Sequence, residues 1–201
     1  MTDRQEVDIK ILRKDLLGVN LSGGDLEPGT AVGETEIDPV TGLLTRIFWE
    51  AEMAQQYRTM KRRGDELFAI VMIDLKKFKK INDKWGHPIG DLVLGAWGSA
   101  IKDRFKRKAD IEGRYGGDEM IAMMIDYKLT EGKQPEDEEN TIHNELVNKV
   151  REILSQGKET NEIPTEDIEA SVGMAVWDGK ESLEGVIKRA DERLYRQKEL
   201  K

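Results

Sequence analysis

Two groups of carboxylates in the sequence have the type and setting needed to hold a metal ion against a phosphate. Asp74 ends the apolar run LFAIVMIDL, and Asp118 and Glu119 follow two glycines between two apolar segments. A carboxylate at the end of an apolar strand costs free energy unless a partner satisfies it, and Mg²⁺ prefers a few carboxylates together with substrate phosphates. If the two segments pack side by side, these carboxylates converge and could hold one or two metal ions at a triphosphate.

A second interpretation of the same residues is purely structural. Asp74 would cap a helix that begins near Lys77, and Asp118 and Glu119 would be ordinary turn residues. The chain also lacks the patterns G-x-x-x-x-G-K-S/T and, after a strand, G-x-G-x-x-G. A nucleotide would therefore have to be bound in some other way.

Three further polar residues are not expected to take part in catalysis. His87 stands alone in the segment HPIGD, and His143 lies in a polar stretch where it should be exposed. Ser171 has no base near it in the sequence, so a nucleophilic role is not expected.

The hydrophobic pattern predicts the elements that must position these residues. Ile47, Ala51, Ala54 and Arg58 recur at helical spacing, and Gly64 should end that helix. The apolar run that follows is typical of a strand buried on both faces.

The next segments predict two helices separated by a short break. FKKINDKW should be helical, with Phe78, Ile81 and Trp85 on one face. HPIGD should interrupt the helical structure after it. The segment DLVLGAWGSAIKDRF then predicts a second helix, whose core-facing residues are Val93, Ala96, Trp97, Ala100 and Ile101.

In the second half of the chain, IEGRYGGDEMIAMMIDY predicts two strands around a tight turn, because paired glycines tolerate positive φ angles. KLTEGKQPEDEEN is acidic and should be a solvated loop. The last three segments predict a helix, a strand and a final amphipathic helix: NELVNKVREIL, IEASVGMAVW and SLEGVIKRADERLYRQKEL.

The predicted order is helix-strand-helix-helix-strand-strand-helix-strand-helix. Alternating helices and strands around one hairpin predict an α/β (α+β) domain of the ferredoxin-like kind, with a central mixed sheet covered by helices. Residues 1–37 form an N-terminal extension and linker, in which Gly23, Gly24 and Asp25 belong to a segment rich in Gly, Pro, Thr and Glu. The domain itself should span residues 38–201.

Composition excludes several classes of protein. A net charge of −8 does not suit a non-specific nucleic-acid binder. The absence of cysteine excludes disulfides, thiolate metal sites and cysteine nucleophiles. No apolar run approaches the ~20 residues that span a bilayer, and the N-terminus lacks the apolar core of a signal peptide. We therefore expect no membrane segment in this chain and a cytoplasmic protein.

Five ordered motif blocks resemble the bacterial GGDEF family of diguanylate cyclases, over about four-fifths of the chain. They are DPVTGLLTR at residues 38–46, DLKKFKKINDKWGHPIGD at 74–91, RKADIEGRYGGDEM at 107–120, SVGMA at 171–175 and ADERLYRQK at 190–198. The resemblance implies a fold related to nucleotide-cyclase and polymerase palms, with a central, mostly antiparallel sheet flanked by helices. It also implies cyclic di-GMP signalling.

The resemblance also implies roles for the residues of the metal site. Asp74 and Asp118 would bind Mg²⁺, or Mn²⁺ in its place, and Leu75 would add its backbone carbonyl. Asp118 would also help to deprotonate the attacking 3′-hydroxyl, while Glu119 would support the metal. Gly116 and Gly117 would let the hairpin backbone approach GTP closely.

Further positions are implied to bind the substrate GTP. Asn82 and Asp91 would hydrogen-bond the guanine edge, which presents an N1–H and an amine that adenine does not. Lys79, the backbone near Phe78, and Lys198 would contact the phosphates. One domain holds one GTP, so the reaction would require a homodimer during turnover.

Arg107 and Asp110 form an R-x-x-D pair before the glycines, which in the family marks an inhibitory site for the product, cyclic di-GMP. An arginine fork suits a phosphate or guanine edge, and an aspartate suits guanine. The alternative for this pair is a surface ion pair, worth ~0–1 kcal/mol.

The sequence departs from the family pattern at several positions. Lys76 replaces a usual aspartate and, if the strand continues, would share the face of Asp74. Met120 replaces phenylalanine, Thr45 replaces asparagine, and the chain ends at Lys201, before a further basic phosphate contact. Two alternatives to an active cyclase follow: a catalytically weak or inactive module that binds GTP or cyclic di-GMP, and a cyclase with altered base choice.

Overall fold

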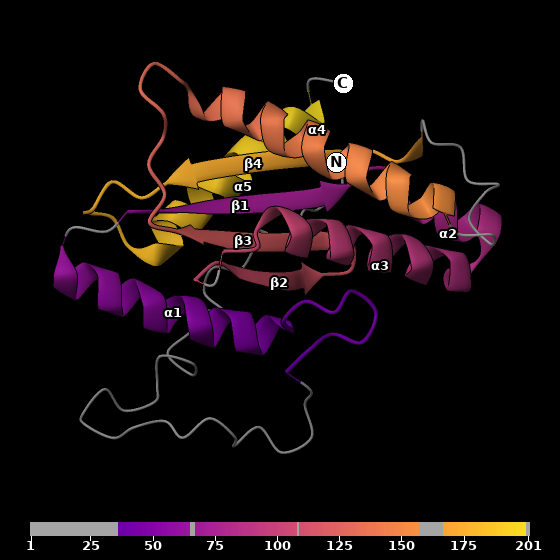
Figure 1. Ribbon diagram of the computed structural model, residues 1–201, viewed down its shortest axis with the longest axis horizontal. Helices are drawn as coiled ribbons and strands as arrows, with labels where there is room; N and C mark the ends of the chain where they lie inside the picture. Colours follow the sequence, from indigo (N-terminus) through magenta and orange to yellow (C-terminus); the bar gives the residue numbers. More distant parts are fainter. Residues whose placement is uncertain (1–35, 65–66, 108, 157–166, 200–201) are drawn as a thin grey trace, which may run out of the picture. The chain divides into compact units, whose positions relative to one another are not determined.

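The computed structural model describes residues 36–64, 67–107, 109–156 and 167–199, which form five helices and four strands (Figure 1). Almost all of the predicted N-terminal extension, including Gly23, Gly24 and Asp25, lies outside these residues. None of the helices described is both long and apolar enough to cross a membrane. The elements are α1 (Arg46–Arg63), β1 (Phe68–Leu75), α2 (Phe78–Trp85), α3 (His87–Arg104), β2 (Ile111–Gly116), β3 (Glu119–Ile125), α4 (Pro135–Gln156), β4 (Ala170–Val176) and α5 (Leu183–Glu199).

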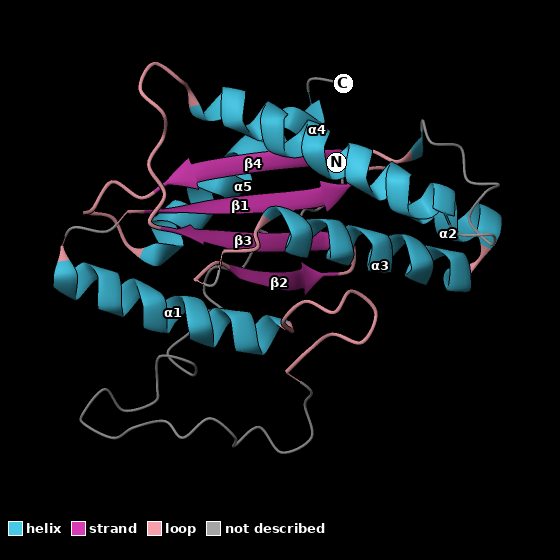
Figure 2. Ribbon diagram, viewed as in Figure 1, coloured by secondary structure: helices cyan, strands magenta, loops and turns pink. Residues whose placement is uncertain are grey.

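The strands form one sheet in the order β2-β3-β1-β4, with all three strand pairs antiparallel (Figure 2). The prediction of a mixed sheet is therefore corrected: parallel pairing in the described residues is limited to an isolated bridge between Leu44 and Gly113. β1 and β2 are connected through α2 and α3 and are separated by β3. This is the split βαβ arrangement of the ferredoxin-like fold, so the predicted fold class is confirmed.

Two hydrophobic cores pack against the two faces of the sheet. Val71 of β1 packs in a core with α2, α3 and α4, whereas its neighbours Ile70 and Met72 pack in a second core with α1 and α5. Successive strand residues point to opposite faces, so both faces of β1 are buried, as its continuous apolar sequence predicts.

Helix α1 forms where it is predicted, but its buried face is not the one that carries the residues whose spacing predicts the helix. Ile47, Ala51 and Arg58 are exposed, and the helix instead buries Trp49. The indole packs directly on β2, where a Cβ atom at Gly113 would lie 2.1 Å from the Trp49 ring. Burial of the large indole outweighs the helical spacing of the smaller residues.

Two segments that are predicted to be irregular are helical. HPIGD opens α3, because proline is well tolerated in a first helical turn where its missing N–H has no helical partner. PEDEEN opens α4 with acidic side chains that favour the positive end of the helix dipole. Glu139 in this segment is only 3% exposed, so the prediction of a solvated loop is wrong there. Gly64 does end α1, in a left-handed conformation (φ 79°).

Side chains from two helices cover the outer edge of β4. The N–H of Met174 donates to Glu139 of α4 (2.8 Å), and the N–H of Val172 donates to Gln197 of α5 (3.1 Å). Glu139 also pairs with Arg193 of α5 (2.5 Å), so three elements meet at this buried carboxylate. Unpaired backbone groups on an outer strand invite pairing with other chains, and these contacts occupy them in the middle of β4.

The opposite outer strand, β2, is covered by backbone around Leu44. The N–H of Leu44 donates to the carbonyl of Glu112 (3.1 Å), and its carbonyl accepts from the N–H of Arg114 (2.9 Å). The turn that leads to Leu44 rests on α3 at Gly98, where a Cβ atom would lie 2.0 Å from the carbonyl oxygen of Thr41. Glycine at position 98 therefore permits the close contact between this turn and α3.

Candidate functional site

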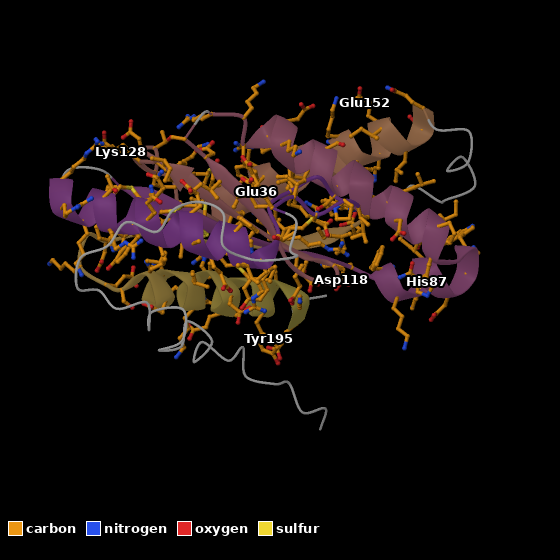
Figure 3. The ribbon with its side chains drawn as sticks, turned by 90° about the horizontal axis from the view of Figure 1, so that it is seen from below. Glu36, His87, Asp118, Lys128, Glu152 and Tyr195 are labelled. Carbon is orange, nitrogen blue, oxygen red and sulfur yellow. The ribbon has the colours of Figure 1, made fainter. Side chains whose placement is uncertain are left out.

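The end of the sheet at which β1 finishes gathers the predicted carboxylates. Asp74 lies opposite Glu119 in the strand register, and the N–H of Leu75 donates to the carbonyl of Asp118 (3.2 Å). The turn between β2 and β3 therefore lies beside the end of β1. Glu119 is the first residue of β3 rather than a turn residue. Figure 3 shows Asp118 and His87 toward the same end of the domain.

The alternative role for Asp74, as the cap of α2, is not observed. α2 begins at Phe78, and within the described part of the chain its first turn has no side-chain cap. Lys77 adopts the left-handed conformation (φ 59°), which is uncommon for a residue with a side chain and turns the chain sharply after β1. The carboxylate of Asp74 therefore belongs to the end of the sheet and not to the helix.

Burial and mutual repulsion govern the protonation of the carboxylates. The pKa values of Asp118 and Glu119 are both raised, first because the side chains are half-buried and second because the charge of Asp74 is near. The positive charge of Lys198 acts in the opposite direction on both groups. Half-buried negative charges that lie together disfavour their own ionisation. A cation bound near them would therefore stabilise their ionised forms.

Lys198 supplies a cation from the last turn of α5. Its ammonium group contacts Oδ2 of Asp74, and the two side chains are 22% and 16% exposed. The family resemblance implies that Lys198 contacts the phosphates of a nucleotide, whereas the structure pairs it with a carboxylate that is expected to bind metal.

The donor set fits a hard divalent cation only in part. Asp74, Asp118 and Glu119 offer carboxylate oxygens, and Leu75 offers a backbone carbonyl, which are the ligand types that Mg²⁺ prefers. Within the described residues, however, no group of three or more acidic or histidine side chains is already arranged to hold a metal ion. These residues offer the ligand types that Mg²⁺ prefers and lie together at the end of β1. Phosphate oxygens of a bound nucleotide would supply the remaining ligands.

Lys76 and His143 both lie near Glu169. β1 ends at Leu75, so the strand alternation that would place Lys76 on the face of Asp74 does not extend to it. The N–H of Lys76 donates to the carbonyl of Glu169 (2.8 Å). His143 is half-buried, with Nε2 3.1 Å from the Glu169 carboxylate, so the prediction of an exposed histidine is wrong.

An arginine holds the turn between β2 and β3. Arg114 donates to the carbonyl of Gly117 (2.7 Å) and to the carboxylate oxygens of Asp38 (3.0 and 3.2 Å). The N–H and hydroxyl of Thr41 donate to Asp38 in turn (2.8 and 2.7 Å). Burial raises the pKa of Asp38, but these hydrogen bonds outweigh it and lower the pKa overall.

The sequence alone predicts no role for Asp38, Thr41 or Arg114, although all three lie in the motif blocks. The first block ends up beside the third because the turn at residues 38–42 folds back onto the hairpin. The motif blocks therefore mark these residues as members of the family pattern, but the spacing between the blocks does not predict that the residues contact one another.

The two glycines of the turn are not required by the packing of the domain. A Cβ atom at Gly116 would meet only Oε2 of Glu119, at 3.9 Å, and one at Gly117 would meet no described atom within 4 Å. Gly117 has a positive φ of 24°, so it is needed for the turn itself. The open space over Gly116 is compatible with the predicted approach of a nucleotide to this backbone.

A second set of predicted residues lies where α2 meets α3. Oδ1 of Asn82 is buried and has no hydrogen-bond partner among the described residues. A Cβ atom at Gly90 would lie 1.8 Å from this oxygen and 3.3 Å from the ring of Phe78. Buried polar atoms nearly always have partners, so Oδ1 of Asn82 is a candidate acceptor for a ligand N–H.

The sequence does not single out Gly90, because its contact with Asn82 arises only when α2 and α3 pack. Asp91 follows Gly90 directly and is exposed, so its carboxylate is accessible near Asn82. Lys79 is also exposed on α2. Asn82 thus packs against the residue that precedes Asp91, and Lys79 lies on the same short helix as Asn82.

The predicted R-x-x-D pair is only partly exposed. Arg107 is exposed, and the N–H of Asp110 donates to its carbonyl (2.9 Å). Asp110 is half-buried and accepts from the N–H of Ile125 (3.1 Å). Burial raises the pKa of Asp110, and the nearby charge of Arg107 acts against this rise. One carboxylate oxygen of Asp110 therefore fixes the end of β3.

Glu112 lies two residues beyond Asp110 and has a strongly shifted pKa. Burial is the main cause, followed by the charge of Asp110, and together they raise the pKa of Glu112 to about 7. The folded protein therefore keeps a proton on Glu112 that the unfolded chain releases once pH exceeds about 4.5. This group lowers stability progressively as pH rises from about 4.5 through 7.

We expect Glu112→Gln to raise stability at pH 8 and to leave it nearly unchanged at pH 4.5, because glutamine mimics the protonated side chain. Solvent screening at this half-buried position reduces the effect, so we expect about 1 kcal/mol at pH 8. Urea denaturation at both pH values measures it. Glu131→Gln, in an exposed loop, is the control; an equal gain at both pH values would contradict the assignment.

Comparison with known proteins gives a consistent result. The model of the family described as "Diguanylate cyclase, GGDEF domain" matches residues 35–201. Diguanylate cyclase DosC from Escherichia coli is 34% identical over 166 residues, covering 81% of this chain and 33% of DosC. Diguanylate cyclase DgcP from Pseudomonas aeruginosa is 30% identical over 161 residues, covering 80% of this chain and 22% of DgcP.

Solved structures resemble this fold as well. The GGDEF domain of DgcB from Caulobacter crescentus, in complex with c-di-GMP, superposes with a TM-score of 0.65 at 26% identity and covers 82% of this chain and 91% of that one. The diguanylate cyclase SiaD from P. aeruginosa, in complex with its activator SiaC, gives a TM-score of 0.59 at 27% identity, with 82% and 58% covered. The chain thus spans about a fifth to a third of the length of the two curated relatives.

Proposed function

This chain belongs to the GGDEF family, and from this premise we propose that it is a diguanylate cyclase, which joins two GTP molecules into cyclic di-GMP and releases two pyrophosphates. The observation that carries the proposal is the meeting of Asp74, Asp118 and Glu119 beside a glycine turn with open space above it. Two relatives of at least 30% identity are named diguanylate cyclases, which supports the same activity. The chain has no cysteine, which fits a cytoplasmic location.

In this reaction the 3′-oxygen of one GTP attacks the α-phosphorus of the other, a P–O bond forms, and the bond to pyrophosphate breaks. The 3′-oxygen of the second GTP then attacks the α-phosphorus of the first, which releases the second pyrophosphate and closes the ring. The hydroxyl proton goes to Asp118, whose pKa is raised by burial and by Asp74 and is therefore better matched to accepting a proton. Arg114 holds the turn that carries Asp118 and so keeps this carboxylate in place.

Mg²⁺, or Mn²⁺ in its place, would be held by Asp74, Asp118 and the carbonyl of Leu75 with support from Glu119, and when bound it neutralises charge on the triphosphate. The chain's own contribution to the phosphates is Lys79, the backbone near Phe78 and Lys198. Gly116 and Gly117 present backbone to the nucleotide without a Cβ atom in the way.

Guanine recognition is assigned to the junction of α2 and α3. Oδ1 of Asn82 lacks a partner among the described residues and can accept an N–H, and the exposed Asp91 can accept two. Guanine presents donors at N1 and N2, whereas adenine has no N1–H. These acceptors favour GTP over ATP and argue against the altered base choice, which a competition assay with both nucleotides would test.

Gly90→Ala is expected to raise the KM for GTP about tenfold, equivalent to ~1.4 kcal/mol of binding, because the new methyl group would occupy the position of the Asn82 amide. The kcat should change less, since the metal site is untouched. Steady-state kinetics with GTP measure both constants. Ser99→Ala, on the exposed side of the same helix, should leave both constants unchanged; a normal KM for Gly90→Ala would remove Asn82 from the guanine site.

Turnover requires two copies of the domain, because each supplies one GTP to the other. We therefore propose a homodimer during the reaction. Arg107 and Asp110 form the proposed inhibitory site for cyclic di-GMP, where the exposed guanidinium would meet phosphate or guanine. The c-di-GMP in the complex with the DgcB domain supports binding of this ligand by the family.

The direct test is to incubate the full chain with GTP and Mg²⁺ and to follow cyclic di-GMP by mass spectrometry. We expect the rate per molecule to rise with protein concentration, since two copies must meet. No product at high protein concentration, with GTP binding intact, would contradict the cyclase.

The contact of Lys198 with Asp74 favours a second candidate function. If that contact persists in the presence of nucleotide, the chain would bind GTP or cyclic di-GMP without turnover and act as a regulatory module. Calorimetry that detects nucleotide binding in a protein without cyclase activity would select this function.

A further inference from the structure

The contact between Lys198 and Asp74 joins residues that lie 124 positions apart in the chain. Asp74 is at the end of the central strand β1, and Lys198 is in the last turn of α5. Both side chains are mostly buried, with 16% and 22% exposed. This is therefore not one of the exposed surface pairs that contribute little.

The packing of α5 brings Lys198 to this position. A Cβ atom at Gly173 of β4 would lie 2.2 Å from the carbonyl oxygen of Ala190 and 2.2 Å from the nitrogen of Leu194, so the helix rests directly on the strand backbone. Gln197 fixes the next turn by accepting from the N–H of Val172 (3.1 Å). The last turn of α5 is thus anchored at the sheet, with the adjacent Lys198 directed to Asp74.

The charge of Lys198 reaches beyond Asp74. It also acts on the two other carboxylates at this end of the sheet, Asp118 and Glu119, in the direction that favours their ionised forms. One ammonium group therefore compensates three negative side chains. A divalent cation held by the same carboxylates would serve the same electrostatic purpose, with a higher charge.

We propose that Lys198 is a built-in counter-ion for the carboxylate site, which a divalent cation must displace from Asp74 before that carboxylate can bind the metal. An ammonium group and a divalent ion at one carboxylate repel each other strongly in a half-buried setting. The proposal rests on the proposed function only for the identity of the site as the metal site. Its consequence is that Lys198 weakens binding of metal alone, and is released toward the phosphates when metal and nucleotide bind together.

The test is the affinity of the nucleotide-free full chain for Mn²⁺, measured by the loss of the electron paramagnetic resonance signal of free Mn²⁺. Lys198→Met keeps most of the side-chain volume and removes the charge, and Lys198→Gln keeps polarity. We expect both variants to bind Mn²⁺ at least about fivefold more tightly than the natural chain. Unchanged or weaker binding in both variants would overturn the proposal.

Lys188→Met is the matched control, because Lys188 lies on the same helix, pairs with Glu192 and is exposed. Its Mn²⁺ affinity should equal that of the natural chain. A second measurement needs no variant: the reactivity of Lys198 toward an amine-acylating reagent, followed by mass spectrometry, should rise when Mn²⁺ saturates the natural chain. Reactivity that stays constant at saturation would overturn the displacement.

These readouts are independent of cyclase activity. If the natural chain makes no cyclic di-GMP but Lys198→Met gains Mn²⁺ affinity, the proposed function fails and the counter-ion role stands. If the natural chain is an active cyclase and neither Lys198 variant gains affinity, the counter-ion role fails and the proposed function stands.

Discussion

Asp118→Asn is expected to lower kcat/KM for cyclic di-GMP formation about 10³-fold, without unfolding the domain. The substitution removes a metal ligand and the proposed proton acceptor together, a loss comparable to removing a major transition-state contact. Stability should not fall, because the natural carboxylate is half-buried beside Asp74 and its pKa is raised by both effects. A coupled pyrophosphate assay measures the rate, and thermal denaturation measures the fold.

Asp126→Asn is the matched control for this variant. Asp126 lies just beyond the other end of β3, is exposed, and has a positive φ of 51° that asparagine tolerates equally well. It should retain full activity. If Asp118→Asn also remained active, the carboxylate at the hairpin would have no part in the chemistry, and the proposed site would be wrong.

Glu139→Ala is expected to cost about 3–5 kcal/mol of unfolding free energy, the largest effect on stability that we predict. The variant leaves Arg193 without its buried partner and leaves the N–H of Met174 without its acceptor. In a domain of this size, the loss corresponds to a fall in Tm of about 10 °C. Chemical denaturation monitored by circular dichroism measures it.

Glu136→Ala provides a close comparison, because Glu136 pairs with the same Arg193 but is 60% exposed. We expect it to cost less than about 1 kcal/mol. Equal losses for the two variants would show that burial of Glu139 and its backbone contact do not matter, contrary to the geometry at the edge of β4.

The sequence predicts most of the fold because its strands are unambiguous. The apolar run before Asp74 is typical of a buried strand, and two glycines between apolar segments favour a tight hairpin. Whether these segments pack side by side depends on the order of the strands in the sheet, so the residues alone predict the meeting of Asp74 and Asp118 only as a condition, and the family resemblance implies it. The buried face of α1 could not be predicted from the sequence. Trp49 is buried because it fits over Gly113, and helical spacing does not reveal such a contact between two elements.

Three contacts of the site could not be predicted from the sequence for the same reason, because each joins two separate elements of the fold. Gly90 contacts Asn82 only after two helices pack, and Arg114 reaches Asp38 across 76 positions. The partner of Lys198 also depends on how closely α5 approaches β4, which Gly173 decides. Pattern within a segment predicts which residues carry chemistry, whereas contacts between distant segments decide their partners.

The coverage of both outer strands bears on how two copies of this domain can meet. Leu44 occupies one flank, while Gln197 and Glu139 occupy the other, at the positions that the structure describes. A continuous intermolecular β-sheet would first have to break these native hydrogen bonds. Encounters between copies should therefore use side-chain surfaces, remain reversible and respond to ionic strength, which suits partners that must come together for each round of synthesis and then separate.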